Sequence, residues 1–129
     1  METTRLADVL VLTPQPFHDD RGLFTRTFDA TIFDDYLGRP GTSASFIQDS
    51  QSRSAKGVIR GMHGRSGRGE AKLVRCANGA VHDVLVDIRK DSPTFGKQQA
   101  FLLPALASRE ETVETGSSHS IARSGSSGA

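Results

Sequence analysis

Apolar residues occur along this chain in short runs, and clusters of Gly, Pro, Asn, Asp and Ser separate the runs. Runs of this length and spacing predict β-strands. One segment has a different period, because Ile32, Phe33 and Tyr36 share one face of a helix for which Asp29 is a suitable N-cap. We therefore expect an all-β protein with one short helix at 29–37. The expected strands are residues 9–12, 23–28, 46–50, 58–63, 71–77, 80–89 and 95–103.

The dipeptide Asn78-Gly79 lies between two runs of alternating polarity, residues 71–77 and 80–89. Asn-Gly in this setting predicts a β-hairpin with a two-residue loop, which fixes the register of its strands. The register makes Lys72 and Asp83 diagonal neighbours on one face, within reach of an ion pair. A pocket lining and a half-exposed sheet face are equally compatible with that face. The opposite face is apolar, needs cover from another sheet or subunit, and consists of Leu73, Val84, Val86 and Ile88.

Arg60 and His63 are three residues apart, so they would point to opposite faces of a regular strand. A β-bulge at Gly61 would bring both to the same side. Both belong to a basic stretch, residues 53–75, for which a solvated surface and an anion site are alternatives. Arginine geometry favours phosphate among anions, and the lack of aromatic residues argues against binding of single-stranded nucleic acid. The basic residues are Arg53, Lys56, Arg60, Arg65, Arg68, Lys72 and Arg75, against one acid, Glu70.

Length and composition restrict the class of protein. The 129 residues suit one domain, and the net charge of +1 excludes a global polyanion binder. The single cysteine, Cys76, permits no internal disulfide and indicates a reducing, cytoplasmic compartment. No apolar run approaches the ~20 residues needed to span a bilayer, and the N-terminus lacks a signal-peptide layout. His63 and His82 are isolated from other ligand residues, so no metal site is expected.

Residues 104–129 differ in composition from the rest of the chain. Seven of them are Ser and three are Gly, and their apolar residues are too scattered to define a face. Such a composition predicts disorder. We therefore expect a folded part, residues 1–103, and a disordered tail, residues 104–129.

The folded part contains a set of motifs that are specific in combination. They are Asp19-x-Arg-Gly-x-Phe24, Phe46-Ile-Gln-Asp49, Gly57-Val-Ile-Arg-Gly-Met-His63, Lys72-Leu-Val-Arg-Cys76, Gly79-Ala-Val-His-Asp-Val-Leu-Val-Asp-Ile-Arg89 and Ser92-Pro-Thr-Phe-Gly96. Through these motifs residues 5–103 resemble the dTDP-4-dehydrorhamnose 3,5-epimerase family of sugar-nucleotide isomerases. The resemblance implies a cupin-like jelly-roll barrel, here incomplete, that forms a homodimer and uses no cofactor. It also implies epimerisation of a dTDP-4-keto-6-deoxy sugar at C3, C5 or both, in deoxysugar biosynthesis of the dTDP-rhamnose type.

The resemblance assigns roles to five residues. In the family's reaction a base removes a proton next to the C4 ketone, a cation stabilises the enolate, and an acid returns a proton to the opposite face. The resemblance implies His63 as the base, because an imidazole suits that task near neutral pH. It implies Lys72 as the cation beside the enolate oxygen. It implies that Arg60 binds the pyrophosphate, and that Arg21 and Gln48 contribute to nucleotide binding.

The hairpin register adds Asp83 to the catalytic residues, as the carboxylate that orients Lys72. Three positions depart from the family pattern. Arg26 stands where Glu is usual, Ser50 where Asn is usual, and Gly64 where an aromatic residue follows the histidine. The last change is similar to members that epimerise a single carbon, so C3 alone and C3 together with C5 both stay open.

The resemblance ends near Leu103, which indicates a truncation, a shifted reading frame or a degenerate copy. Family members are longer, and their further strands carry a tyrosine acid and an aspartate paired with the base. The only tyrosine of this chain is Tyr36, on the expected helix. The alternative to an epimerase is therefore an inactive remnant or a non-catalytic nucleotide-sugar-binding protein. A metal-dependent cupin is disfavoured by the lack of paired histidines.

Overall fold

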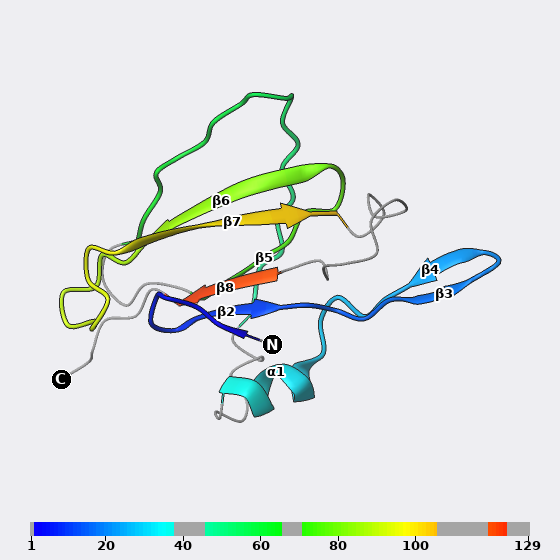
Figure 1. Ribbon diagram of the computed structural model, residues 1–129, viewed down its shortest axis with the longest axis horizontal. Helices are drawn as coiled ribbons and strands as arrows, with labels where there is room; N and C mark the ends of the chain where they lie inside the picture. The colour runs from blue at the N-terminus through cyan, green and yellow to red at the C-terminus, as the bar shows by residue number, and fades with distance from the viewer. Residues whose placement is uncertain (1, 38–45, 66–70, 106–118, 124–129) are drawn as a thin grey trace. The chain divides into compact units, whose positions relative to one another are not determined.

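The structure, a computed structural model, describes residues 2–37, 46–65, 71–105 and 119–123. The chain forms two compact units, one of residues 1–25 and 65–129 and the other of residues 26–64. No helix in the described ranges is long and apolar enough to cross a membrane. The elements are β1 (Glu2–Thr3), β2 (Val9–Leu12), β3 (Phe17–Asp19), β4 (Gly22–Phe24), α1 (Ala30–Leu37), β5 (Ala71–Val74), β6 (Ala80–Val86), β7 (Gln98–Pro104) and β8 (His119–Arg123) (Figure 1).

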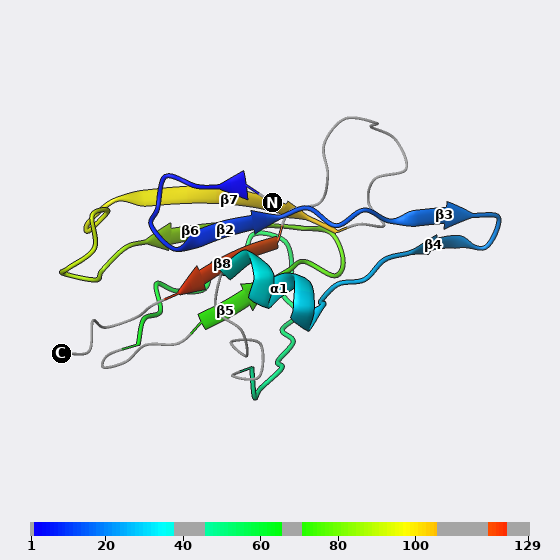
Figure 2. The same ribbon diagram turned by 90° about the horizontal axis from the view of Figure 1, so that it is seen from below.

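The first unit contains two sheets that share a core. One is a four-stranded antiparallel sheet in the order β1-β2-β8-β5, and the other is the antiparallel pair β6–β7. In both views β6 and β7 run alongside β2 and β8 (Figures 1 and 2). The expected strands at 9–12 and 95–103 correspond to β2 and β7.

The core of the first unit lies between these two sheets. Leu6 and Val9 contribute to it from the N-terminal side, and Phe101 and Leu103 contribute from β7. Val74, Cys76 and Leu85 pack against these buried residues. Because side chains alternate along a strand, the core-facing positions of β5 are the even-numbered ones and those of β6 are the odd-numbered ones.

A second hairpin, β3–β4, extends away from the other strands of the first unit (Figures 1 and 2). Its turn joins Asp19 to Gly22, and Gly22 has a φ of 121°, which a residue with a side chain rarely adopts. The strand expected at 23–28 is shorter, because β4 ends at Phe24. Phe17 and Phe24 are cross-strand partners and remain 73% and 68% exposed.

The second unit is organised by aromatic residues around α1. Asp29 is the N-cap, as expected, and its carboxylate accepts hydrogen bonds from the backbone N–H groups of Thr31 and Ile32. Phe33 is buried on the helix, and its ring lies 5.6 Å from that of Phe28 and 5.2 Å from that of Phe46 between centroids. Such tilted and edge-to-face pairs are the favoured arrangement of aromatic rings.

The prediction of an Asn78-Gly79 hairpin is wrong. The strand before this dipeptide, β5, pairs with β8, and the strand after it, β6, pairs with β7. A two-residue type I′ loop needs positive φ at both positions. Gly79 has a φ of 76°, but Asn78 is not among the described residues with positive φ. The turn therefore carries the chain from one sheet to the other instead of folding it back.

The strands expected at 46–50 and 58–63 are also absent, and with them the bulge expected at Gly61. Residues 46–65 contain neither helix nor strand, although a turn forms near Gly57, where Val58 N–H donates to the carbonyl of Ala55. A strand needs a partner for its backbone groups, and no described strand pairs with this segment. Ile47 and Ile59 are accordingly 89% and 93% exposed.

The structure differs from the expected disordered tail at two places. Strand β7 continues to Pro104, and residues 119–123 form β8, which lies between β2 and β5. Both edges of β8 are therefore paired. Residues 106–118 and 124–129 lie outside the described residues.

Candidate functional site

Lys72 and Asp83 lie on the faces of the two sheets that meet at the core of the first unit. Lys72 has the same orientation on β5 as Val74, which packs against the core. Asp83 is paired with buried Phe101 on β7 and has the same orientation as Leu85. Lys72 is exposed and Asp83 is half-buried. The two residues thus approach the core from opposite sheets, whereas the sequence predicted a single hairpin face.

Arg21 is located at the tip of the β3–β4 hairpin, where its guanidinium pairs with a nearby carboxylate. Its Nε donates to Asp19 Oδ2 at 3.0 Å, and its backbone N–H donates to Asp19 Oδ1 at 2.9 Å. These bonds lower the pKa of the Asp19 carboxyl and raise that of Arg21. Both side chains are largely exposed, so the pair is held in place by its own short turn.

Gln48, Arg60 and His63 belong to the second unit, in the segment without regular structure, and all three are exposed. The Arg60 guanidinium bonds to the turn that precedes it. Its Nε donates to Ser54 Oγ at 2.9 Å and its Nη2 donates to the Arg53 carbonyl at 3.2 Å. These contacts hold the exposed guanidinium of Arg60, a group that suits an anion, against its own turn.

A buried carboxylate, Asp87, is the centre of a polar network in the first unit that the sequence did not predict. Its side chain is 3% exposed and accepts hydrogen bonds from Arg89, Ser92 and Thr94. The bonds from Arg89, more than the others, hold the pKa of the Asp87 carboxyl well below its usual range. Asp87 directly follows β6, and continued alternation gives it the same orientation towards the core as Asp83 and Leu85. A carboxylate at such a position needs a partner, and that requirement was the available sequence signal.

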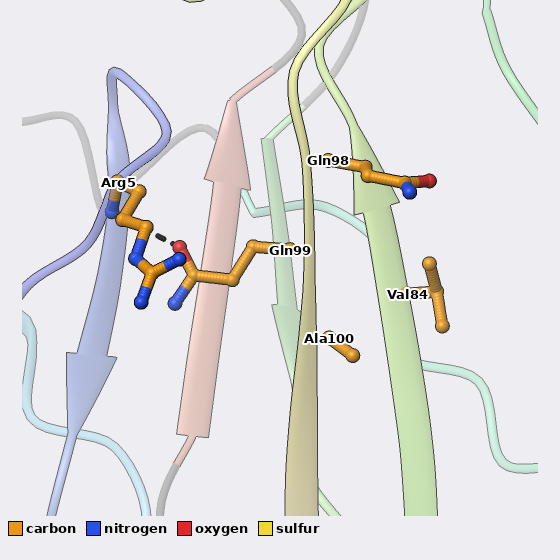
Figure 3. Close-up of a pocket in the computed structure, with 5 residues that line it drawn as sticks. All are labelled: Arg5, Val84, Gln98, Gln99 and Ala100. Atoms are coloured by element: carbon orange, nitrogen blue, oxygen red, sulfur yellow. Dashed lines mark hydrogen bonds between the residues drawn. The ribbon is translucent and has the colours of Figure 1, made fainter.

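A shallow hollow of about 410 Å³ lies along β7 and is lined by Arg5, Val84, Gln98, Gln99 and Ala100 (Figure 3). Gln99 points towards Arg5, whose backbone N–H donates to Gln99 Oε1 at 3.0 Å. None of the predicted site residues lines this hollow. We therefore do not place the candidate site there.

Within the described ranges, no cluster of His, Cys, Asp and Glu could hold a metal ion. Cys76, the single cysteine, is half-buried, and its thiol donates to the Asn78 carbonyl at 3.1 Å. The charged and imidazole side chains among the predicted site residues can offer proton transfer and stabilisation of negative charge.

The chain is similar to known proteins in both sequence and structure. The sequence signature of the family described as dTDP-4-dehydrorhamnose 3,5-epimerase matches residues 3–124. The enzyme of that name from Escherichia coli K12 is 45% identical over 117 residues, which cover 90% of this chain and 62% of the relative. A crystal structure of the enzyme from Elizabethkingia anophelis has a TM-score of 0.72 and 36% identity, over 96% of this chain and 67% of that one.

These likenesses first define the class: this is an all-β, cupin-like domain with one short helix among its described residues. The chain belongs to the dTDP-4-dehydrorhamnose 3,5-epimerase family. It spans about three-fifths of the length of the curated relatives it matches. The match reaches residue 124, so the predicted end of the resemblance near Leu103 is wrong.

Proposed function

We propose that this chain takes part in the epimerisation of a dTDP-4-keto-6-deoxy sugar next to its C4 ketone, as an isomerase of dTDP-rhamnose-type biosynthesis. The observation that carries the proposal is the family match over residues 3–124, within which His63 and Lys72 stand in the matching motifs. A related enzyme from Legionella pneumophila, 34% identical with a TM-score of 0.72 over 95% of this chain and 64% of that one, has been solved with dTDP-4-keto-L-rhamnose.

The proposed reaction begins with proton abstraction. The imidazole of His63 takes the proton from C3 or C5, and the electron pair moves onto the C4 oxygen to give an enolate. Lys72 stabilises the negative charge on that oxygen, and Asp83 orients Lys72. A positioned cation of this kind contributes about 10²–10³ in rate, by analogy with oxyanion donors. Protonation of the same carbon from the opposite face then completes the inversion.

Arg60 is proposed to bind the pyrophosphate, and Arg21 and Gln48 to bind the remainder of the nucleotide. A guanidinium that carries two contacts to its own loop is already partly ordered, which lowers the entropy cost of binding. No cofactor is part of the proposal, because the C4 ketone itself acidifies the neighbouring protons. A cytoplasmic location accords with a chain whose single cysteine is unpaired.

A homodimer is proposed as the working assembly. The outer face of β6–β7 presents apolar side chains, with Val84 44% exposed and Leu102 55% exposed. Val86 lies beside them on the same face, because residues 82, 84 and 86 pair with residues 102, 100 and 98. An apolar face of this kind is covered in stable proteins by another sheet or subunit.

Uptake of deuterium from D₂O at C3 and C5 of a dTDP-4-keto-6-deoxy sugar tests the proposed function. NMR would follow the uptake together with formation of the epimer. We expect uptake at C3 with the wild-type chain and at least roughly 100-fold slower uptake with His63→Ala, the usual loss for a general base. Equal uptake by the two proteins would refute the assignment of His63.

The second candidate is a nucleotide-sugar binder without turnover. It is favoured by the exposed guanidinium of Arg60, which its own turn holds in place and which can bind a phosphate without any catalytic group. The same experiment separates the two functions. Binding of dTDP with no deuterium uptake at either carbon supports the binder, whereas uptake without inversion indicates a working base that lacks its acid.

A further inference from the structure

The Asp87 network joins two parts of the first unit that are far apart in sequence. Arg89 is its central donor, since Nε bonds to Asp87 Oδ1 at 2.9 Å and Nη2 bonds to Asp87 Oδ2 at 2.7 Å. This two-point contact fixes the plane of the guanidinium. Only 17% of the Arg89 side chain is exposed, so its remaining donors point at other groups of the protein rather than at bulk solvent.

Those remaining donors contact the turn between β1 and β2. Arg89 Nη1 bonds to Asp8 Oδ2 at 2.6 Å, and Nη2 bonds to the Ala7 carbonyl at 2.8 Å. A parallel contact comes from Thr94, whose hydroxyl accepts the backbone N–H of Ala7 at 3.0 Å while donating to Asp87. The turn therefore makes three polar contacts with residues 89–94, more than eighty positions away.

The turn between β1 and β2 has an uncommon backbone conformation. Asp8 has a φ of 61°, in a region that residues with side chains seldom adopt. On either side of it, Leu6 and Val9 are buried in the shared core. The turn thus presents its apolar side chains to the core and its polar groups to Arg89 and Thr94.

Besides the shared core, the bond from Arg5 N–H to Gln99 and the chain from β7 to β8, two further connections join the four-stranded sheet to β6–β7. Residues 75–79 link β5 to β6 covalently, and Ala105 N–H donates to the Gly79 carbonyl beside that link. The Asp87 network connects the β1–β2 turn to the segment that follows β6. We propose that the Asp87 network fixes the four-stranded sheet against β6–β7 and so positions Lys72 on one sheet relative to Asp83 on the other. Arg89 and Thr94 are then positioning residues, and this inference rests on the proposed function.

Thr94→Val and Thr94→Ser form the test pair, because valine removes the hydroxyl at nearly constant shape and serine retains it. Both are made in the whole chain, together with Arg26→Gln, which removes the exposed Arg26–Asp29 ion pair of the second unit. Amide hydrogen exchange by NMR reports opening of β2. Loss of a bond to the buried Asp87 carboxylate should accelerate exchange at residues 9–12 by roughly 10–100-fold. Thr94→Ser and Arg26→Gln should match the wild type.

Two further measurements report on the position of Lys72. Without substrate, the ¹³C chemical shift of the Lys72 Cε should change in Thr94→Val and not in Thr94→Ser. With substrate, deuterium uptake at C3 should slow by roughly 10–100-fold, the usual consequence of a small misplacement, while the Kd of dTDP stays constant. Arg89→Lys serves as a second variant, since a single ammonium cannot replace a fork with four partners.

The outcomes separate the two levels of the proposal. Faster exchange together with a shifted Lys72 resonance and slower uptake supports it. Unchanged exchange in both Thr94→Val and Arg89→Lys overturns the role of the network in holding the sheets. Faster exchange with an unchanged Lys72 resonance overturns positioning. If no protein incorporates deuterium, the proposed function fails, and the exchange and resonance data still decide about the network.

Discussion

At the residue scale, the polar side chains of this chain fall into two groups with different surroundings. Arg21 and Arg60 are held in place by short-range contacts in exposed turns. Asp87 and Arg89 are removed from solvent and have several partners each. A side chain of the first group can exchange its present contacts for contacts with a ligand at a small cost in free energy. A charge in the second group cannot lose its partner without a large penalty.

Replacement of Arg60 should weaken dTDP binding much more than replacement of His63. A charge-assisted contact to phosphate acts in the ground state, whereas a base acts mainly in the transition state. We expect Arg60→Ala to raise the Kd of dTDP by roughly 10–100-fold, the value of one hydrogen bond to a charged group, and His63→Ala to leave it nearly unchanged. Calorimetric titration measures both. Equal losses would contradict the roles given to the two residues.

Protonation of Asp87 should make folding stability depend on pH. Its pKa is lowered in the folded state, so the stabilisation is fully present above the ordinary Asp pKa of about 4 and is lost as the pH falls below that value. The free energy of unfolding, measured in urea between about pH 6 and pH 2, should decrease more steeply for the wild type than for Asp87→Asn. Asp19 and Asp29 also have lowered pKa values and contribute equally to both proteins. Parallel pH profiles would contradict this prediction.

At the element scale, the sequence predicted features that depend on neighbouring residues. It did not predict which strands pair when they are far apart in the chain. The N-cap at Asp29 and strands β2 and β7 follow from neighbouring residues, and they were predicted. Strand partners were not, because β5 pairs with β8 almost fifty residues later. Loop composition contains no information on such long-range pairing.

The candidate site shows the same limit. Its residues were identified through motifs, and the face shared by Lys72 and Val74 follows from alternation alone. The placement of Lys72 and Asp83 on two facing sheets does not follow from alternation, because it requires the strand partners of β5 and β6 to be known. The contact between Arg89 and Asp8 joins residues 81 positions apart, and no local pattern indicates it.

A side chain at Gly79 should destabilise the protein slightly. The φ of 76° at Gly79 disfavours a side chain, while a Cβ built there would meet no atom within 4 Å. Gly79→Ala should therefore cost only the backbone term, about 1 kcal/mol, which corresponds to a Tm lower by roughly 3–5 °C. Gly79→Asn should cost less, because asparagine tolerates positive φ. Thermal unfolding of the three proteins measures the difference, and a larger loss for asparagine than for alanine would be inconsistent with the observed turn.

At the scale of the whole molecule, the two faces of β6–β7 both carry apolar side chains and differ in exposure. The inner face holds Phe101 and Leu103 in the core, together with Asp83. The outer face holds Val84 and Leu102, both substantially exposed. A two-stranded sheet by itself is only marginally stable. Cover for the outer face would therefore stabilise the same element that carries Asp83.

Charge placed on the outer face should separate the proposed homodimer without unfolding the protomer. In Val84→Lys the ammonium would be buried against an apolar partner surface, which is costly, whereas in the isolated protomer it would reach water. We expect the wild type to sediment as a dimer at micromolar concentration and Val84→Lys as a monomer with unchanged circular dichroism. Gln15→Lys, which adds the same charge to the exposed loop between β2 and β3, should remain dimeric. A monomeric wild type, or a dimeric Val84→Lys, would mean that this face is not the subunit interface.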